Sequence, residues 1–227
     1  MEYGQMARYY DVLYRDKDYN REVAFLKSFF PKNSKRALDL GCGTGEHLRL
    51  LKAHPLESTG VDISPEMIAI AKTKIPADFI ISDILTYRSR KKFDIIISMF
   101  AVCNHLSSEK ELKEMLCHVK EMLKKNGVII LDFHNPAAGG EKRDRMNGVE
   151  RTMKWRVNSA QKKEYSEITY TVDGHVFKTR HQFTIYTIEQ LTKLSEDLAF
   201  RLIGFYENYT LTPATNASKN IQMVLKK

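Results

Sequence analysis

A glycine-rich loop, LGCGTGEH, directly follows a short apolar segment and is the clearest sign of chemistry in the chain. Gly41, Gly43 and Gly45 let the backbone approach a ligand closely and leave amides free where a helix would begin. A dinucleotide-binding loop reads GxGxxG, but here the third glycine comes one residue early and Glu46 stands in its place. Asp39, just before the loop, adds a second carboxylate. The loop therefore predicts a ligand that is positively charged or zwitterionic at this point.

Acidic residues also follow the next two apolar segments. Asp62 ends one of them, 21 residues after Gly41, and can accept hydrogen bonds from two ribose hydroxyls. Asp83 follows the other and can bind the amino group of an adenine, with the Ile84 amide facing a ring nitrogen. Ile63 and Met67 are expected to flank the ring, although Met67 fits a core position equally well. Because ligands of open α/β sheets bind at the ends of successive strands, the series indicates one ligand site.

Apolar and amphipathic segments alternate over the first 134 residues. The segments expected to form strands are 36–40, 58–63, 77–82, 93–100 and 127–133. Helices are expected at 45–54, 65–74 and 109–125, with Ser64 as an N-cap, Pro65 at the first helical position and Gly127 ending the last one. Segments that are apolar on both faces are typical of parallel strands covered by helices.

The pattern changes after His134. Residues 135–148 are rich in turn formers and charges, and 149–158, 162–172 and 175–187 alternate polar with apolar residues, as half-exposed antiparallel strands do. The Asp173–Gly174 pair predicts a tight hairpin. A helix at 187–200, capped by Thr187, and closing strands at 201–211 and 220–227 complete the chain.

These elements predict an α/β fold with a doubly wound, Rossmann-like, mostly parallel sheet of seven strands and helices on both faces. An antiparallel β cap is inserted after strand 5. We expect one domain over 1–227, with an N-terminal helical lid at 1–30 and the cap at 135–186.

Composition sets wide limits. The 227 residues carry a net charge of +8, which permits a nucleic-acid or phosphorylated partner, but the basic runs are short or mixed in sign. Three cysteines without a CxxC pair predict no metal site and a reducing environment. Without a signal-peptide pattern or a bilayer-length apolar run, the expected location is the cytoplasm and no membrane partner is expected.

The run LDLGCGTGEH … GVDIS … SDILTY … FDIIISMF … LKKNGVIILDF resembles the class I S-adenosylmethionine-dependent methyltransferase family over roughly 36–134. The resemblance implies S-adenosyl-L-methionine as cofactor and S-adenosyl-L-homocysteine as product. It places the glycines at the methionine and ribose, Asp62 at the ribose diol and Asp83 at the adenine amine. The cofactor-binding residues expected are Tyr10, Tyr14, Tyr19, Gly41, Cys42, Gly43, Gly45, His47, Asp62, Ile63, Met67, Asp83, Ile84 and Met99.

The family motifs do not specify the methyl acceptor. The segment SMFAVCNHL at the fourth strand lacks the (N/D)PP(Y/F) sequence of nucleobase-amine methyltransferases, and Cys103 lacks a Pro-Cys context. The chain resembles small-molecule enzymes, among them the amino-sugar N,N-dimethyltransferases of the desosamine and mycaminose type. That resemblance implies that Tyr14 orients the acceptor and that His105 is the general base. His134 and His181 are further candidates.

The expected function is methyl transfer to an amine or hydroxyl of a small molecule, a class that includes nucleotide-linked and phosphorylated amino sugars. The protein would act as a monomer or homodimer, without a nucleic-acid partner. The main alternative is an RNA or protein methyltransferase, which a cluster of Arg143, Arg145, Arg151, Lys154 and Arg156 beside the pocket would support. A binding protein without activity is a further alternative, which the intact loop and acidic residues disfavour.

The tyrosine-rich segment YYDVLYRDKDY, residues 9–19, is interpreted as a lid over the methionine end and the acceptor. In this interpretation Tyr14 faces the acceptor, Tyr10 or Tyr19 faces the methionine, and Tyr9 packs in the core.

Overall fold

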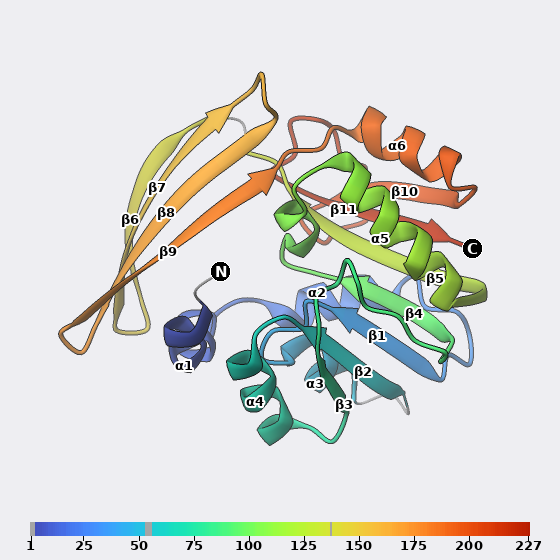
Figure 1. Cartoon of the computed structure of the whole chain (residues 1–227), viewed down its shortest axis with the longest axis horizontal. Helices are drawn as coiled ribbons and strands as arrows, with labels where there is room; N and C mark the ends of the chain where they lie inside the picture. Colours follow the sequence, from blue (N-terminus) through green and yellow to red (C-terminus); the bar gives the residue numbers. More distant parts are fainter. Residues whose placement is uncertain (1–2, 53–55, 137) are drawn as a thin grey trace.

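A seven-stranded sheet forms the body of the protein. The computed structural model describes residues 3–52, 56–136 and 138–227. The strand order is β10-β11-β5-β4-β1-β2-β3, and of these seven β11 alone runs antiparallel to the others (Figure 1). The strands are β1 (Arg36–Leu40), β2 (Glu57–Asp62), β3 (Asp78–Ile81), β4 (Phe93–Ser98), β5 (Leu123–His134), β10 (Arg201–Glu207) and β11 (Asn220–Lys226). The predicted fold class is confirmed.

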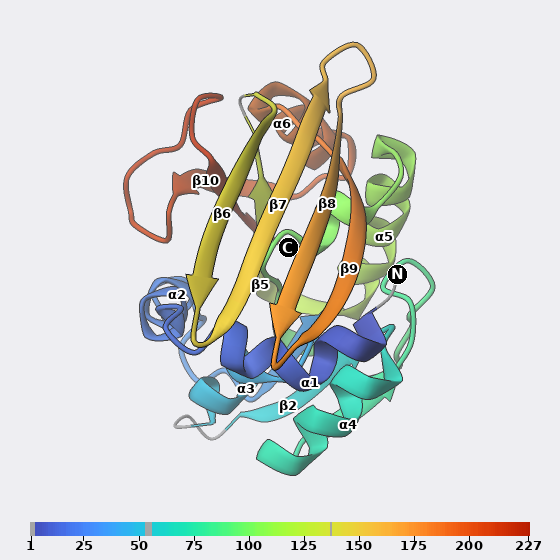
Figure 2. The same cartoon turned by 90° about the vertical axis from the view of Figure 1, so that its left-hand side faces the viewer.

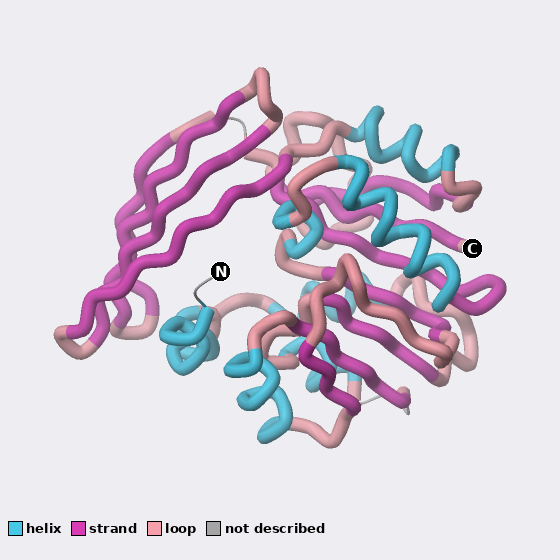
Figure 3. Tube along the Cα trace, viewed as in Figure 1, coloured by secondary structure: helices cyan, strands magenta, loops and turns pink. Residues whose placement is uncertain are grey.

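Helices cover both faces of this sheet (Figure 3). They are α2 (Tyr19–Lys27), α3 (Glu46–Leu51), α4 (Pro65–Lys74), α5 (Glu109–Met122) and α6 (Ile188–Asp197). Alternate residues of a strand enter opposite cores: Leu38 packs with α5 and α6, whereas Ala37 packs with α2 and α3. This alternation explains why the strands are apolar on both faces.

Most helix ends follow the predicted chemistry. Ser64 caps α4, with Pro65 in its first turn, and Thr187 and Gln190 form a complete capping box on α6. The prediction that Gly127 ends α5 is wrong, because the helix stops at Met122 and β5 already begins at Leu123. Leu123 is buried and pairs with Phe93, so burial in the sheet outweighs the helix propensity of the lysines that follow it.

A second, antiparallel sheet stands beside the first and is called the cap sheet below (Figure 2). It comprises β6 (Gly140–Met146), β7 (Val149–Asn158), β8 (Lys163–Val172) and β9 (His175–Thr184) in sequential order. The Asp173–Gly174 hairpin is confirmed, with positive φ at both residues. The turn-rich, charged segment 135–148 contains a strand that the sequence did not predict: GEKRDRM forms edge strand β6, because its seven residues pair in register with β7.

The cap sheet touches the body at two places. Near its hairpins, its inner face packs on α1 (Tyr3–Leu13) through a cluster that includes Leu13, Val149, Tyr170 and Phe177. At the opposite end, it joins the short 3-10 helix η1 (Val102–His105) that follows β4. The space between the two sheets is therefore bounded by α1 near the hairpins of the cap sheet and by η1 at the opposite end.

Among the described residues, no helix is long and apolar enough to cross a membrane.

Candidate active site

One cavity of about 940 Å³ lies where the carboxyl ends of the parallel strands meet the inner face of the cap sheet. This volume is near the upper end of the range for small-molecule sites, about 300–1,000 Å³. Of the predicted site residues, these line it: Tyr10, Tyr14, Gly41, Gly43, Asp62, Ile63, Met67, Asp83, Ile84, Met99 and His105. His134 and His181 line it too. The structure therefore brings the motifs and the candidate histidines to a single place.

The glycine loop is held open by Asp62. Its carboxylate accepts hydrogen bonds from the Gly43 amide at 2.8 Å and from the Ser64 amide at 2.9 Å. Gly41 and Gly43 have positive φ, and a Cβ on Gly41 would lie 2.5 Å from a methyl group of Val102. Glycine is thus required at position 41 by both conformation and space.

The predicted adenine end is apolar on one side and acidic at its edge. Ile63 is 57% exposed, whereas Met67 is buried and also serves the core, as its sequence position allowed. The Asp83 carboxylate accepts a hydrogen bond from the Leu85 amide at 2.8 Å. This leaves an apolar surface for a planar ring beside one carboxylate.

Asp39 is buried beneath the loop, and neither carboxylate oxygen has a hydrogen-bond partner among the described residues. Burial raises its pKa to about 6; His47 opposes this shift and Asp62 adds to it. A buried carboxylate without a partner is costly. Asp39 lines neither cavity, so its pairing with the ammonium of the expected cofactor remains a prediction.

Buried ionic contacts lie beside the loop. Lys17 pairs with Glu22 and lies 4.0 Å from the centre of the Tyr19 ring. Glu22 also hydrogen bonds with His47 Nε2 at 2.7 Å. Tyr19, Cys42 and His47 line a second, smaller cavity of about 30 Å³, so their predicted contact with the cofactor remains a prediction. Gly45 caps α3 in the left-handed conformation and lines neither cavity.

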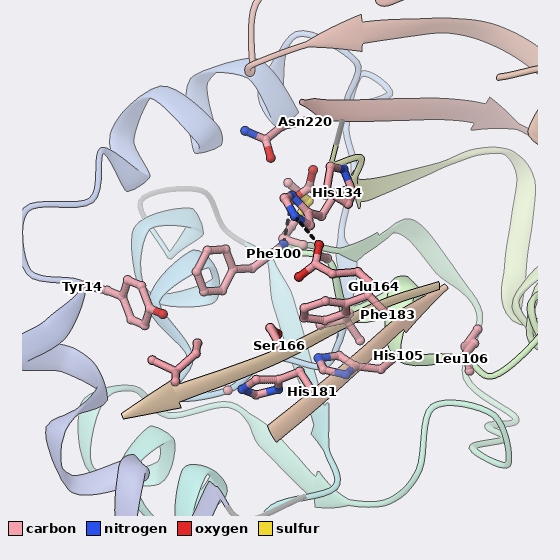
Figure 4. Close-up of a pocket in the computed structure, with 18 of the residues that line it drawn as sticks. Tyr14, Phe100, His105, Leu106, His134, Glu164, Ser166, His181, Phe183 and Asn220 are labelled. Atoms are coloured by element: carbon pink, nitrogen blue, oxygen red, sulfur yellow. Dashed lines mark hydrogen bonds and ion pairs between the residues drawn. The ribbon is translucent and has the colours of Figure 1, made fainter. Parts of the chain in front are cut away.

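The opposite half of the cavity holds three histidines around one phenylalanine (Figure 4). The Phe183 ring centroid lies 4.6 Å from His105, 5.7 Å from His181 and 6.1 Å from His134. Burial, together with the neighbouring His181, lowers the pKa of His105 to about 4. At neutral pH the His105 imidazole is therefore uncharged, and it takes up a proton weakly.

Glu164 was missed at the sequence level. It projects from β8 into the same half and hydrogen bonds with His134 Nε2 at 3.1 Å. The alternation in KEYSEITYTV places Glu164 on one face with Ser166, Ile168 and Tyr170, and burial follows that alternation. This pattern could have identified Glu164, provided that the face toward the cavity was known.

Tyr14 joins the N-terminal segment to the cap sheet. Its ring meets Phe100 edge-on at 5.0 Å, and its hydroxyl hydrogen bonds with Arg151, which forms a two-point ion pair with Asp144 at 2.7 and 2.9 Å. Burial raises the pKa of Tyr14 despite the nearby guanidinium. The phenol thus stays protonated and able to donate a hydrogen bond.

Comparison with known proteins agrees with this geometry. A family model described as a methyltransferase domain matches residues 37–127. The uncharacterized protein MJ1252 of Methanocaldococcus jannaschii is 31% identical over 217 residues, which cover 93% of this chain and 80% of that protein. The dTDP-3-amino-3,6-dideoxy-alpha-D-glucopyranose N,N-dimethyltransferase of Streptomyces fradiae is 31% identical over 136 residues.

The match with the Streptomyces protein covers 57% of this chain and little more than half, 53%, of that relative. Among solved structures, an S-adenosylmethionine-dependent methyltransferase from Clostridium acetobutylicum superimposes with a TM-score of 0.86 at 22% identity. That superposition covers 99% of this chain and 98% of the other, so the two share one fold over their whole length.

Proposed function

Since this chain belongs to the S-adenosylmethionine-dependent methyltransferases, we propose that it methylates an amine of a small molecule, with a nucleotide-linked or phosphorylated amino sugar as the acceptor class. The observation that carries the proposal is that cofactor motifs and a polar acceptor half share one cavity of about 940 Å³ beneath the cap sheet. A hydroxyl is the alternative acceptor group.

The residues of the cofactor half fit the expected group. When bound, the cofactor supplies a methyl group activated by a positively charged sulfur. Gly41 and Gly43 permit close approach of the ligand, Asp62 would hold the ribose hydroxyls, and Asp83 the adenine amine. Asp39, buried beneath the loop, would supply a negative charge toward the ammonium. Together these residues would hold the methyl donor in place.

The acceptor half contributes alignment and exclusion of water. Tyr14 and Phe100 form an aromatic wall, and the Tyr14 hydroxyl would orient the acceptor. His105 would act as a neutral hydrogen-bond acceptor toward the substrate, because its low pKa keeps it uncharged. Amine methylation makes modest demands on a base, since the lone pair of a neutral amine is already nucleophilic.

An amino sugar as acceptor is supported by the activity for which the Streptomyces relative is named. Exposed Lys219 also lines the cavity, where its ammonium could meet a phosphate of the acceptor. The tail of a nucleotide-linked sugar would thus extend past the cap sheet toward solvent.

The RNA or protein alternative has less support. Arg143, Arg145, Lys154 and Arg156 do not line the cavity, and Arg151 is occupied by Asp144. Arg143 and Lys154 pair with Glu141, and Arg156 lies over the Tyr165 ring. The basic residues therefore do not form the cluster beside the pocket that this alternative requires.

The test is an assay with S-adenosylmethionine and a panel of acceptors. The panel contains dTDP-3-amino-3,6-dideoxy-α-D-glucopyranose, its 3-hydroxy counterpart, free amino sugars, amino acids and a mixed RNA. Mass spectrometry should detect one or two added methyl groups on the amino sugar and none on the hydroxy sugar or RNA. Methylation of RNA alone would overturn the proposal.

A further inference from the structure

We infer that Glu164, held by His134, is the residue that receives the acceptor amine and stabilises the positive charge that its nitrogen gains during transfer. This inference rests on the proposed function and deepens it, because it assigns a selective role for an amine to a residue that no motif identifies.

Burial sets Glu164 apart from its neighbours on the same strand. Its side chain is 5% exposed and faces the cavity, whereas Glu167, on the outer face of β8, is 36% exposed and pairs with Lys178 and Arg180. A carboxylate in such a place is costly unless a partner compensates it. Since an ionised carboxylate only accepts hydrogen bonds, His134 must donate from Nε2. One such bond leaves acceptor capacity on Glu164 for a ligand.

The other buried carboxylates near the acceptor are already occupied. Asp132 accepts hydrogen bonds from Tyr209 Oη at 2.7 Å, the Phe100 amide at 2.9 Å and Gln222 Nε2 at 3.0 Å. Glu22 is bound by Lys17 and His47. Among the described residues of the acceptor half, Glu164 is thus the buried carboxylate with room for a further donor.

The position of the pair is fixed by a rigid joint. The Asn104 side chain is fully buried; it donates to the His134 carbonyl at 2.9 Å and the Thr184 carbonyl at 2.8 Å, and it accepts from the His134 amide at 2.9 Å. Lys163, the neighbour of Glu164, donates to the Ser107 carbonyl at 2.5 Å. These bonds tie the ends of β5 and β9 to η1, and the start of β8 to the residues that follow η1. Catalytic groups need such fixed placement.

The movement of charge explains the need for a carboxylate. The neutral amine donates one N–H to Glu164 and directs its lone pair at the methyl carbon. The new N–C bond forms while the C–S bond breaks, and the bonding pair stays on sulfur. The positive charge therefore moves from sulfur to nitrogen, next to a carboxylate in a water-poor site, where fixed charges act most strongly. The nitrogen then transfers its proton to Glu164. The His134 side chain, which is 37% exposed, links Glu164 to the solvent, where the proton can leave.

A hydroxyl would not gain from this arrangement in the same way. Its oxygen must lose a proton as it is methylated, so no lasting positive charge forms beside Glu164. The residue would thus favour amines over hydroxyls of the same shape.

The test compares Glu164→Gln with Glu167→Gln, the same change on the outer face of the same strand. With dTDP-3-amino-3,6-dideoxy-α-D-glucopyranose, E164Q should lower kcat by about 100-fold, and E167Q should stay within about twofold of wild type. Glu164→Asp, which keeps the charge, should retain more activity than E164Q. S-adenosylhomocysteine affinity, measured by calorimetry, should be equal in all four proteins. Equal kcat in E164Q and wild type would overturn the inference.

A second readout needs no methyl transfer, so it separates this inference from the proposed function. Methylammonium is titrated into the S-adenosylhomocysteine complex while the ring nitrogens of His134 are followed by NMR. Wild type should show the Nε2–H tautomer and a saturable shift with methylammonium, and E164Q, whose neutral amide can still accept the Nε2–H bond, should lose the shift. If the amino sugar is no substrate but this pattern holds, only the proposed acceptor class fails. An identical methylammonium response in E164Q would overturn the role of Glu164 whatever the substrate.

Discussion

The two halves of the cavity are built by different means. The cofactor half consists mainly of backbone turns at the ends of β1, β2 and β3, where glycines and single acidic residues follow each strand. The acceptor half consists of side chains from alternate positions of β8 and β9, together with η1 and the end of β5. The residues of the first half belong to short local motifs in the sequence. Those of the second half come together only when distant strands pack in the fold.

This difference in construction predicts that the two halves have different roles. A loop that binds through its backbone tolerates few residue types, whereas a cap sheet can change its inner side chains without altering its hydrogen-bonded ladder. We therefore expect changes in the cofactor half to abolish binding of the methyl donor. Changes in the acceptor half should alter which molecule is methylated and how fast.

The largest effect is expected at Gly41, a residue of the cofactor half that packs against η1. Gly41→Ala would place a methyl group 2.5 Å from Val102, the first residue of η1, in a backbone conformation with φ of +78°. Clash and conformation together should lower the free energy of unfolding by about 3 kcal/mol. S-adenosylhomocysteine affinity should fall at least 100-fold, or by about 2.7 kcal/mol.

Gly148→Ala is the matched control for Gly41→Ala, because its φ is +86° and, apart from its chain neighbours, no described residue has an atom within 4 Å of the added carbon. This substitution should lower the free energy of unfolding by about 1 kcal/mol, the penalty of the left-handed conformation alone, and leave ligand binding intact. Denaturant unfolding and calorimetry measure both quantities. Equal losses in the two variants would show that Gly41 is not a point of close approach.

Asp39 should make binding in the cofactor half depend on pH. Because burial raises its pKa to about 6, Asp39 is mostly neutral at pH 5 and ionised at pH 7. An ammonium pairs with the ionised form, so S-adenosylhomocysteine affinity should increase about tenfold from pH 5 to pH 7. Adenosine, which lacks the ammonium, should show little change.

The effect of Asp39 on folding stability has the opposite dependence on pH. A carboxyl group with a raised pKa favours the folded state at low pH, and that contribution is lost as pH rises through about 6. Asp39→Asn should remove most of the pH dependence of S-adenosylhomocysteine binding. A dependence that persists unchanged in this variant would exclude Asp39 as the partner of the ammonium.

His105→Asn should leave cofactor affinity unchanged and reduce methyl transfer about tenfold, the value of one lost hydrogen bond to the acceptor. Since the pKa of His105 is about 4, the pH–rate profile between pH 5 and 8 should show no limb that the substitution removes. A limb near pH 6 to 7 that disappears in the variant would make His105 the general base.

The stability of the wild type should also respond to His105. Between pH 6.5 and pH 4 His105 is protonated in the unfolded chain but largely unprotonated in the folded one. The free energy of unfolding should therefore fall as pH falls through this window. His105→Asn should weaken that fall, which thermal unfolding at several pH values measures.

The smallest effect is expected on the outer face of the cap sheet. Lys154→Ala and Arg156→Ala remove exposed contacts with Glu141 and Tyr165, and such contacts contribute up to about 1 kcal/mol. Methylation of the amino sugar should change less than twofold. A large loss of activity on RNA in these variants would instead support the basic surface as a substrate site.

The sequence predicted the body of the fold well, because strands covered on both faces and capped helices leave strong local patterns. It did not predict β6, whose charged edge strand has no apolar alternation and owes its form to pairing with β7. It also placed the end of α5 too late, since only the buried pairing of Leu123 with Phe93 marks the true boundary.

The same reasoning applies to the site. Asp62 and Asp83 could be identified because each follows its own strand. The alternation along β8 places Glu164 on a buried face but does not reveal its partner, because His134 is 30 residues away and the two meet only through the packing of the cap sheet on η1 and β5. Nor does the sequence show that burial weakens His105 as a base.

The most direct test of this account is a crystal structure of the protein with S-adenosylhomocysteine and dTDP-3-amino-3,6-dideoxy-α-D-glucopyranose. The account predicts the adenine between Ile63 and Met67, the ribose on Asp62, and the sugar nitrogen within hydrogen-bonding distance of Glu164. A sugar nitrogen distant from Glu164, or an acceptor bound on the outer face of the cap sheet, would contradict it.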